Sequence, residues 1–126
     1  MAERKAKFRL RSYVINDASI KFDKDNLPSD ISVTMKRSGY KHDSGEYHFS
    51  IAVKIEDLVR KFELNVTCHS IFEFDRELID EELQKYTTVN APAILFPYIR
   101  AYISTLTALS GIAPIILPTI NLAAKD

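Results

Sequence analysis

The feature that most constrains this chain is one long apolar segment near its carboxyl end. Residues 89–122 read VNAPAILFPYIRAYISTLTALSGIAPIILPTINL. Helical spacing runs through the first part of the segment, at Leu95, Tyr98, Ile99, Tyr102, Leu106 and Leu109. The apolar surface extends to the other sides through Ile94, Phe96 and Ile103. Because a helix that is apolar on all sides is buried on all sides, we expect a second copy of the chain or a bound polypeptide to cover it.

Residues with known positional preferences mark the ends of this helix. Asn90 is a candidate N-cap, and Pro92 would stand in the first turn, where its missing N–H does least harm. Gly111 is a natural stop, because glycine readily adopts the left-handed conformation that ends helices. A short charged helix is predicted before it, over residues 77–86. Prolines interrupt the apolar run before it reaches the ~20 residues that a membrane-spanning helix needs, so we expect no membrane insertion.

The first half of the chain alternates apolar and polar residues with a period of two, which is typical of half-buried strands. In the first run, Phe8, Leu10 and Val14 are predicted to face one way, and Arg9 and Arg11 the other. The four runs cover residues 8–14, 31–36, 47–55 and 61–74. They predict an α+β fold: a four-stranded antiparallel sheet in meander order, with the long apolar helix packed on its one apolar face.

Three connections join these strands. Residues 41–45 have the polar and glycine composition of a short hairpin loop, and residues 56–59 form a tight link. The longer span 17–30 is either a crossover or an irregular loop. We therefore treat residues 1–126 as one domain, which is long enough to build a core without a disulfide or a metal ion.

Composition excludes several classes of protein. The chain has 17 Lys plus Arg and 17 Asp plus Glu, so its charge balance does not point to nucleic acid. Cys68 is the single cysteine, and a lone thiol suits a reducing compartment. The basic amino-terminal run has no apolar core of a secretory signal. These features predict a cytoplasmic protein.

A search for catalytic or metal-binding residues returns little. His42 stands in a polar loop, and His48 and His69 fall on the polar faces of strands. Cys68 and His69 are neighbours on one strand, so their side chains point to opposite faces and form neither a metal-ligand pair nor a nucleophile pair. The carboxylates of residues 75–82 fit a solvated helix start. We expect no catalytic residue, no metal and no cofactor.

Two stretches of the apolar segment resemble a known family. Residues 94–100, ILFPYIR, and residues 120–123, INLA, are similar to the signature helix and loop of the SecB protein-export chaperone family. The family's opening strand resembles residues 8–22, with its turn carried by Tyr13, Asp17 and Ser19. The resemblance covers the chain from Phe8 to Ala123.

The resemblance implies a dimer or a dimer of dimers and an ATP-independent holdase, a chaperone that binds unfolded polypeptide clients in apolar grooves. It implies that the long helices pack between copies, through Leu95, Tyr98, Ile99, Tyr102, Ile103 and Leu106. By position, the groove would be lined by Phe22, Leu27, Ile31, Val33, Met35, Ile112, Ile115 and Leu117.

The chain also departs from the family pattern. Members typically dock the translocase motor SecA through an acidic patch, and Asp17 matches one such position, whereas Lys21 and Asn65 replace acidic residues. Members typically continue into a second amphipathic helix and an acidic tail, whereas this sequence ends at Asp126. These differences weaken the match to the SecA-docking surface and suggest a SecB-like chaperone with another role, such as guarding an antitoxin. The candidate partners are SecA or an antitoxin.

Two other functions compete with this interpretation. A carrier of an apolar small molecule, such as a thioesterase-like or acyl-binding protein, would also wrap a sheet around a helix. It would need a polar nucleophile or base facing the pocket, and the candidates here face water. A purely structural oligomerisation module would share the apolar helix but bind no client.

Overall fold

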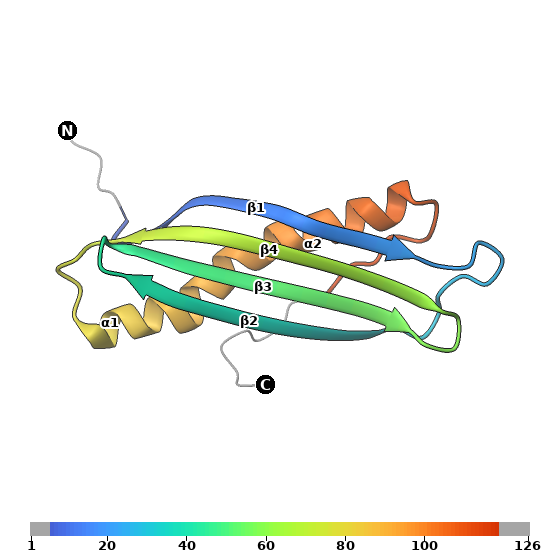
Figure 1. Cartoon of the computed structure of the whole chain (residues 1–126), viewed down its shortest axis with the longest axis horizontal. Coiled ribbons are helices and arrows are strands. Elements are labelled where there is room, and N and C mark those ends of the chain that lie inside the picture. Colours follow the sequence, from blue (N-terminus) through green and yellow to red (C-terminus); the bar gives the residue numbers. More distant parts are fainter. Residues whose placement is uncertain (1–5, 119–126) are drawn as a thin grey trace.

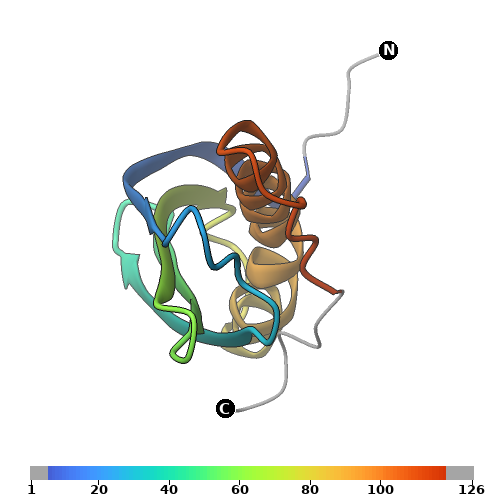
Figure 2. The same ribbon diagram turned by 90° about the vertical axis from the view of Figure 1, so that its right-hand side faces the viewer.

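The computed structural model describes residues 6–118, which form one sheet and one helical layer. The helical layer crosses one face of the sheet diagonally (Figure 1), and an end-on view shows the two layers (Figure 2). The strands are β1 (Phe8–Lys21), β2 (Ser32–His42), β3 (Glu46–Asp57) and β4 (Phe62–Phe74). The helical segments are α1 (Asp80–Lys85), the π-helical turn η1 (Tyr86–Asn90) and α2 (Ala91–Leu109). The predicted antiparallel sheet with one long helix on one face is confirmed.

The strand order is β1-β4-β3-β2, and all neighbours are antiparallel. Strands β2, β3 and β4 therefore follow the predicted meander order. Strand β1 pairs with β4 instead of with β2. Residues 22–31 carry the chain across the end of the sheet to its opposite edge (Figure 1). The crossover is thus the correct alternative for this span. It begins later than predicted, because β1 continues to Lys21.

Two β-bulges divide β1. The register against β4 shifts between Leu10 and Ser12 and again between Ile15 and Asp17. Each inserted residue turns the following side chains to the opposite face. Val14 consequently lies opposite His69 and is 54% exposed. The prediction that Val14 shares a face with Phe8 and Leu10 is wrong, because strict alternation ends at the first bulge.

The hydrophobic core lies between the central strands and one face of α2. The helix-facing side chains of β3 and β4 are almost completely buried, among them Ile51, Ile55, Leu64, Val66 and Phe72. The helix contributes Leu95, Ile99 and Ile103, whose side chains have no exposed surface. Burying a large aliphatic side chain contributes about 1.5–3 kcal/mol, so this contact dominates the stability of the fold.

The helical layer is continuous from Asp80 to Leu109. Asn90 has helical backbone angles, φ −77° and ψ −42°, and its side chain makes no capping hydrogen bond. The predicted N-cap at Asn90 is therefore wrong, and the short helix begins at residue 80 instead of 77. The π turn stands directly before Pro92, which has no N–H to donate to the preceding turn.

Gly111 ends α2 as predicted. Its φ is +89°, and its N–H bonds to the carbonyl of Ala108 at 3.1 Å. The next N–H, of Ile112, bonds to the carbonyl of Thr107 at 3.3 Å. This pair of bonds is the Schellman motif, and it turns the chain back along the helix.

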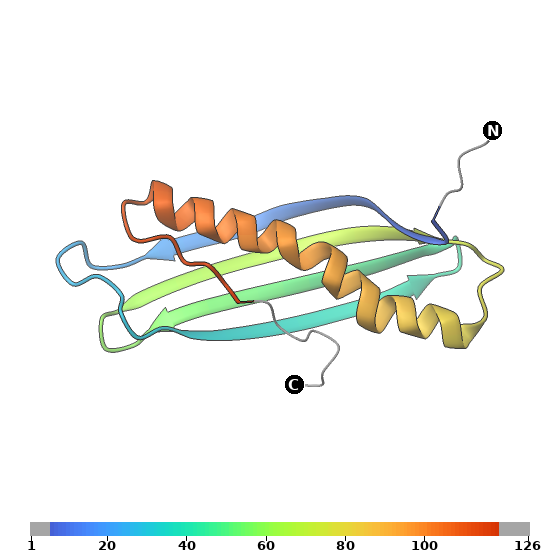
Figure 3. The same ribbon diagram turned by 180° about the vertical axis from the view of Figure 1, so that it is seen from behind.

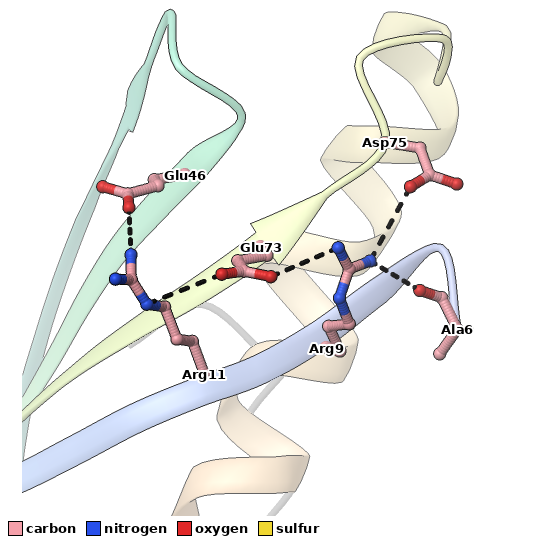
Figure 4. Close-up of polar contacts among 6 residues, drawn as sticks. All are labelled: Ala6, Arg9, Arg11, Glu46, Glu73 and Asp75. Atoms are coloured by element: carbon pink, nitrogen blue, oxygen red, sulfur yellow. Dashed lines mark hydrogen bonds and ion pairs between the residues drawn. The ribbon is translucent and has the colours of Figure 1, made fainter.

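A network of ion pairs fixes the amino-terminal end of β1 on the outer face of the sheet (Figure 4). Arg9 lies 3.2 Å from Glu73 and 3.7 Å from Asp75. Arg11 is the residue inserted at the first bulge, and it reaches across β4 to Glu46 on β3 while also pairing with Glu73. These groups are partly exposed, so each pair contributes about 1 kcal/mol or less. The network aligns β1 more than it stabilises the fold.

A buried carboxylate ties the crossover to the turn between β3 and β4. Asp57 is 2% exposed and accepts bonds from the backbone N–H groups of Ser29 (3.0 Å), Asp30 (3.1 Å) and Arg60 (3.2 Å). The Arg60 guanidinium donates to it at 3.1 Å. The bond from Ser29, with those from Asp30 and Arg60, lowers the pKa of Asp57 to about 2, against the opposing effect of burial.

We predict that Asp57→Asn lowers the midpoint of unfolding at pH 7 and flattens its dependence on acid pH. Because the folded-state pKa is below its ordinary value of 3.8, the charged carboxylate stabilises the fold above about pH 4. That contribution disappears as the pH falls towards 2. Urea unfolding at pH 7, 4 and 2 checks this, with Asp30→Asn as the exposed control. Equal acid sensitivity of the Asp57→Asn variant and the native chain would contradict the assignment.

Candidate functional site

The helical layer leaves the β2 edge of the sheet incompletely covered (Figure 3). The residues of β2 on the side of this layer are those that pair with buried residues of β3. They are Val33, Met35, Arg37, Gly39 and Lys41. Val33 is 38% exposed although it lies on the core side. We call the space between these residues and the helical layer the β2 groove. It contains a pocket towards each end.

The loop pocket lies at the Ile31 end of the groove and has a volume of about 320 Å³. It is formed by the crossover on one side and the loop after α2 on the other. Its lining is Leu27, Pro28, Ser29, Ile31, Ile112, Ala113, Pro114, Ile115 and Ile116. The fold thus brings together four residues that the sequence placed at the client site: Leu27, Ile31, Ile112 and Ile115.

Two polar side chains of α2 hold the loop in place. The Thr107 hydroxyl is buried, donates to the carbonyl of Ile103 at 2.8 Å and accepts from the Ile115 N–H at 2.9 Å. The Arg100 Nε donates to the carbonyl of Leu117 at 2.8 Å. Sequence analysis missed this role, although both residues are polar within an apolar helix. The loop pocket is therefore preformed.

The aromatic pocket lies at the other end of the groove and has a volume of about 260 Å³. It is lined by Arg37, Ser38, Gly39, Tyr47, Phe49, Thr87, Thr88 and Pro92. The Tyr47 ring lies directly under Gly39, where any Cβ would collide with the phenol hydroxyl. Burial raises the pKa of Tyr47 and the Arg37 charge opposes that effect, so the hydroxyl stays neutral. A glycine inside a strand signals such a close approach.

The other predicted groove residues divide between surface and core. Val33 and Met35 lie on β2 between the two pockets, and Phe22 packs on Phe62 with ring centroids 6.2 Å apart. Ile112 and Leu117 are 7% and 1% exposed. Both side chains therefore anchor the loop, and Ile112 also borders the loop pocket. The large apolar side chain that the loop exposes is Ile116, at 71%, which sequence analysis did not single out.

The predicted oligomer residues divide in the same way. Leu95, Ile99 and Ile103 are completely buried within the single chain, which corrects their assignment to a contact between copies. The face of α2 that carries these three residues packs on the sheet. Tyr98 and Tyr102 remain 43% and 37% exposed, and Leu106 is half-buried. We call the remaining exposed surface the α2 outer face, made of Ala93, Pro97, Tyr98, Ala101, Tyr102, Thr105, Ala108 and Leu109.

The opposite face of the sheet carries the histidines. His48 lies 3.1 Å from Glu46 and packs on His42 and Tyr40, and His69 bonds to Ser50 at 2.7 Å. His48 and His69 border a concavity of about 550 Å³. Burial raises the pKa of the Cys68 thiol to about 11, which disfavours the nucleophilic thiolate. Within residues 6–118, no group of three candidate ligands could hold a metal ion.

The predicted motor contact also lies on this outer face. Asp17 is opposite Thr67, and Lys21 is opposite Glu63. Lys54 stands 3.8 Å from both Glu56 and Glu63. The surroundings of Asp17 are therefore of mixed charge. None of the helices in the described part of the chain has the length and apolarity needed to cross a bilayer.

We predict that Thr107→Val destabilises the protein by about 1–3 kcal/mol, because it leaves the Ile115 N–H without its acceptor. Thr107→Ser keeps the hydroxyl and should retain most of the stability. Urea unfolding measures the loss, and amide exchange at Ile115 locates it. Native-like protection of that amide in Thr107→Val would show that the hydroxyl does not hold the loop.

This chain is similar in sequence and in fold to known proteins. The family model of the preprotein translocase subunit SecB matches residues 5–124. The protein-export protein SecB of Anaplasma phagocytophilum is 29% identical over 143 aligned residues, which cover 94% of this chain and 89% of that protein. An uncharacterised protein of Methanocaldococcus jannaschii is 32% identical over 115 residues, 91% of this chain but 65% of its own length.

A solved structure supports the same fold. A SecB-like chaperone of Mycobacterium tuberculosis, in complex with a peptide from an antitoxin, superposes with a TM-score of 0.73 at 15% identity. The match covers 90% of this chain and 88% of that one. Because the family model spans nearly the whole sequence and the fold agrees, the chain belongs to the SecB family.

Proposed function

We propose that the protein is an ATP-independent holdase that binds apolar segments of non-native polypeptides in the β2 groove. The observation that carries the proposal is a preformed apolar groove beside an exposed edge strand, in a chain of the SecB family. The side chains that would contact a client are Leu27, Ile31, Val33, Ile115 and Ile116, with Phe49 and Pro92 in the aromatic pocket. The activity belongs to the cytoplasm, where clients are still unfolded.

The energetics of such a site favour weak, multiple contacts. Burying one large apolar side chain contributes about 1.5–3 kcal/mol, and the two pockets each hold one or two side chains. After the cost of association is subtracted, one groove alone gives affinities in about the millimolar range. Several grooves on one oligomer raise the effective concentration of a long client for the remaining sites. An assembly therefore strengthens capture without a nucleotide.

The α2 outer face supplies a surface for that assembly. Tyr98 packs against Tyr13 with ring centroids 4.6 Å apart, and Leu109 is 83% exposed. Partly exposed aromatic residues of this kind are enriched at protein interfaces. We infer a homo-oligomer, either a dimer or a dimer of dimers, in which two copies of α2 cover each other.

Two settings fit this activity. Curated relatives are named for protein export, and the Mycobacterium tuberculosis chaperone binds an antitoxin peptide. Docking of SecA through Asp17 would use an outer face that also carries Lys21 and Lys54, and these cations weaken attraction to a basic partner. We therefore favour a dedicated client such as an antitoxin over export through SecA.

A carrier of an acyl group is less well supported. It would need a nucleophile or base within the apolar groove, whereas His48 and His69 border the concavity on the opposite face of the sheet. The hydroxyls of Thr87 and Thr88 border the aromatic pocket, but both donate to the carbonyl of Gln84.

We predict that Ile31→Asp and Val33→Asp weaken client capture at least tenfold, because a carboxylate in the groove opposes burial of apolar side chains. Thr34→Asp is the matched control on the outer face of the same strand. Suppression of aggregation of a chemically denatured model protein measures capture, and circular dichroism checks that each variant is folded. Full suppression by the folded groove variants would contradict the proposal.

We also predict that Tyr102→Asp reduces the molar mass in solution to that of a smaller assembly, because it places a charge within the α2 outer face. Thr34→Asp should leave the mass unchanged. Light scattering after size-exclusion chromatography makes the comparison. An unaltered mass for Tyr102→Asp would place the contact between copies elsewhere.

A further inference from the structure

The turn between β3 and β4 presents two apolar side chains to solvent. Leu58 is 79% exposed and Val59 is 83% exposed. Glycine, proline and small polar residues ordinarily occupy such tight turns. In the described part of the chain, neither side chain belongs to the core or lines a pocket of the β2 groove. We call this turn, residues 58–61, the β3–β4 knob.

Hydrogen bonds fix the backbone of the knob. The buried Asp57 carboxylate accepts from the Arg60 N–H at 3.2 Å and from the Arg60 guanidinium at 3.1 Å. The Lys61 N–H bonds to the carbonyl of Leu58 at 3.4 Å. Lys61 closes the turn with a φ of +55°, a conformation that is unfavourable for a residue other than glycine. A projection that is already ordered loses little entropy when another surface covers it.

The knob lies at the same end of the molecule as the loop pocket. An end-on view shows the β3–β4 turn, the crossover and the loop after α2 together at this end (Figure 2). Asp57 connects the knob to the pocket, because it also accepts from the N–H of Ser29, which lines the pocket. Leu27 and Ile116 are exposed at the same end. Residues 6–118 therefore leave an apolar end of the molecule uncovered.

A projection and a pocket that share one end of a molecule suit a two-fold pair. In such a pair both copies use the same surface, so each knob meets the pocket of the other copy. The loop pocket has a volume of about 320 Å³ and no charged residue in its lining. Because the contact is used twice, it closes on itself and does not continue into a fibre.

Charge favours a second copy over a membrane surface. The knob carries Arg60 and Lys61 and no acidic residue, and Asp30 stands between two lining residues of the loop pocket. A two-fold pair brings the cations of each knob towards the carboxylate beside the other copy's pocket, which is electrostatically complementary. An anionic membrane would instead meet the crossover, residues 22–31, with three aspartates and one lysine.

We propose that two copies of the chain cap each other end to end, with Leu58 and Val59 of each knob in the loop pocket of the other copy. The contact uses a surface other than the α2 outer face. Its consequence for clients rests on the proposed function. A capped pocket is closed to clients, and a client that competes for the pocket releases the cap. The pair thus covers the apolar end while no client is present.

Cysteine pairs on separate copies test the contact. The native Cys68 is buried, so the introduced thiols are the ones that react. Copies with Val59→Cys are mixed with differently tagged copies with Ile116→Cys, and a mild oxidant then links the two. Thr34→Cys, on the outer face of β2, replaces Ile116→Cys in the control mixture. We expect the knob-to-pocket disulfide to form at least tenfold faster than the control disulfide.

Two changes should slow this disulfide. Leu58→Asp in the Val59→Cys copies should slow it at least tenfold, because a carboxylate opposes burial in the pocket. A chemically denatured model protein should slow it by competing for the pocket. Leu58→Asp alone should suppress aggregation as the native chain does at low chain concentration and better at high concentration, where native copies cap each other. Circular dichroism checks that each variant is folded.

Equal rates for the Ile116→Cys and Thr34→Cys mixtures would overturn the inference. Shielding of the Val59→Cys thiol from a maleimide by vesicles of phosphatidylcholine and phosphatidylglycerol would then assign the knob to lipid. A disulfide rate that a captured client leaves unchanged would place the contact outside the pocket and also overturn the inference. A fast knob-to-pocket disulfide in a chain that fails to protect a denatured protein would support the contact and refute the proposed function alone.

Discussion

The fold depends on the difference in width between the four-stranded sheet and the single helix that covers it. A four-stranded sheet is about 14–19 Å across, because neighbouring strands lie about 4.8 Å apart. A helix with its side chains is about 10 Å wide. One helix therefore covers the central strands, where Ile55, Leu64 and Phe72 are buried, and leaves the β2 edge incompletely covered. The groove follows from this geometry. The same packing uses only one face of an apolar helix, so Tyr98 and Tyr102 remain available to a partner.

Exposed apolar loops usually collapse onto the nearest surface, and polar anchors prevent that here. Thr107 and Arg100 bond to the backbone of the loop after α2, and Asp57 bonds to the backbone of the crossover. Both loops contribute to the loop pocket. These side chains act on backbone atoms, so they fix the path of the chain while its apolar side chains stay at the surface. A preformed site of this kind loses less conformational entropy when it binds.

The regular elements could be predicted because their patterns are local. Alternation located the strands, and helical spacing with Gly111 gave the position and end of α2. The bulges in β1 escaped prediction because Arg11 and Asn16 are polar residues in a run that already contains exposed positions. The cap assigned to Asn90 failed because a π turn joins the two helices, so the backbone is already helical at Asn90. Four of the eight predicted groove residues line one pocket, since the crossover and the final loop meet at the same end of the sheet.

By itself, the sequence determined the fold class and an excess of apolar surface, because both follow from the order of apolar and polar residues along the chain. Only the tertiary structure decided which part of that surface is free. Ile103 and Tyr102 are neighbours in an apolar run, yet the first is completely buried and the second is more than one third exposed. Adjacent residues point about 100° apart around a helix. Which of them meets the sheet is set by the rotation of α2 about its own axis, and that rotation depends on contacts between residues far apart in the chain.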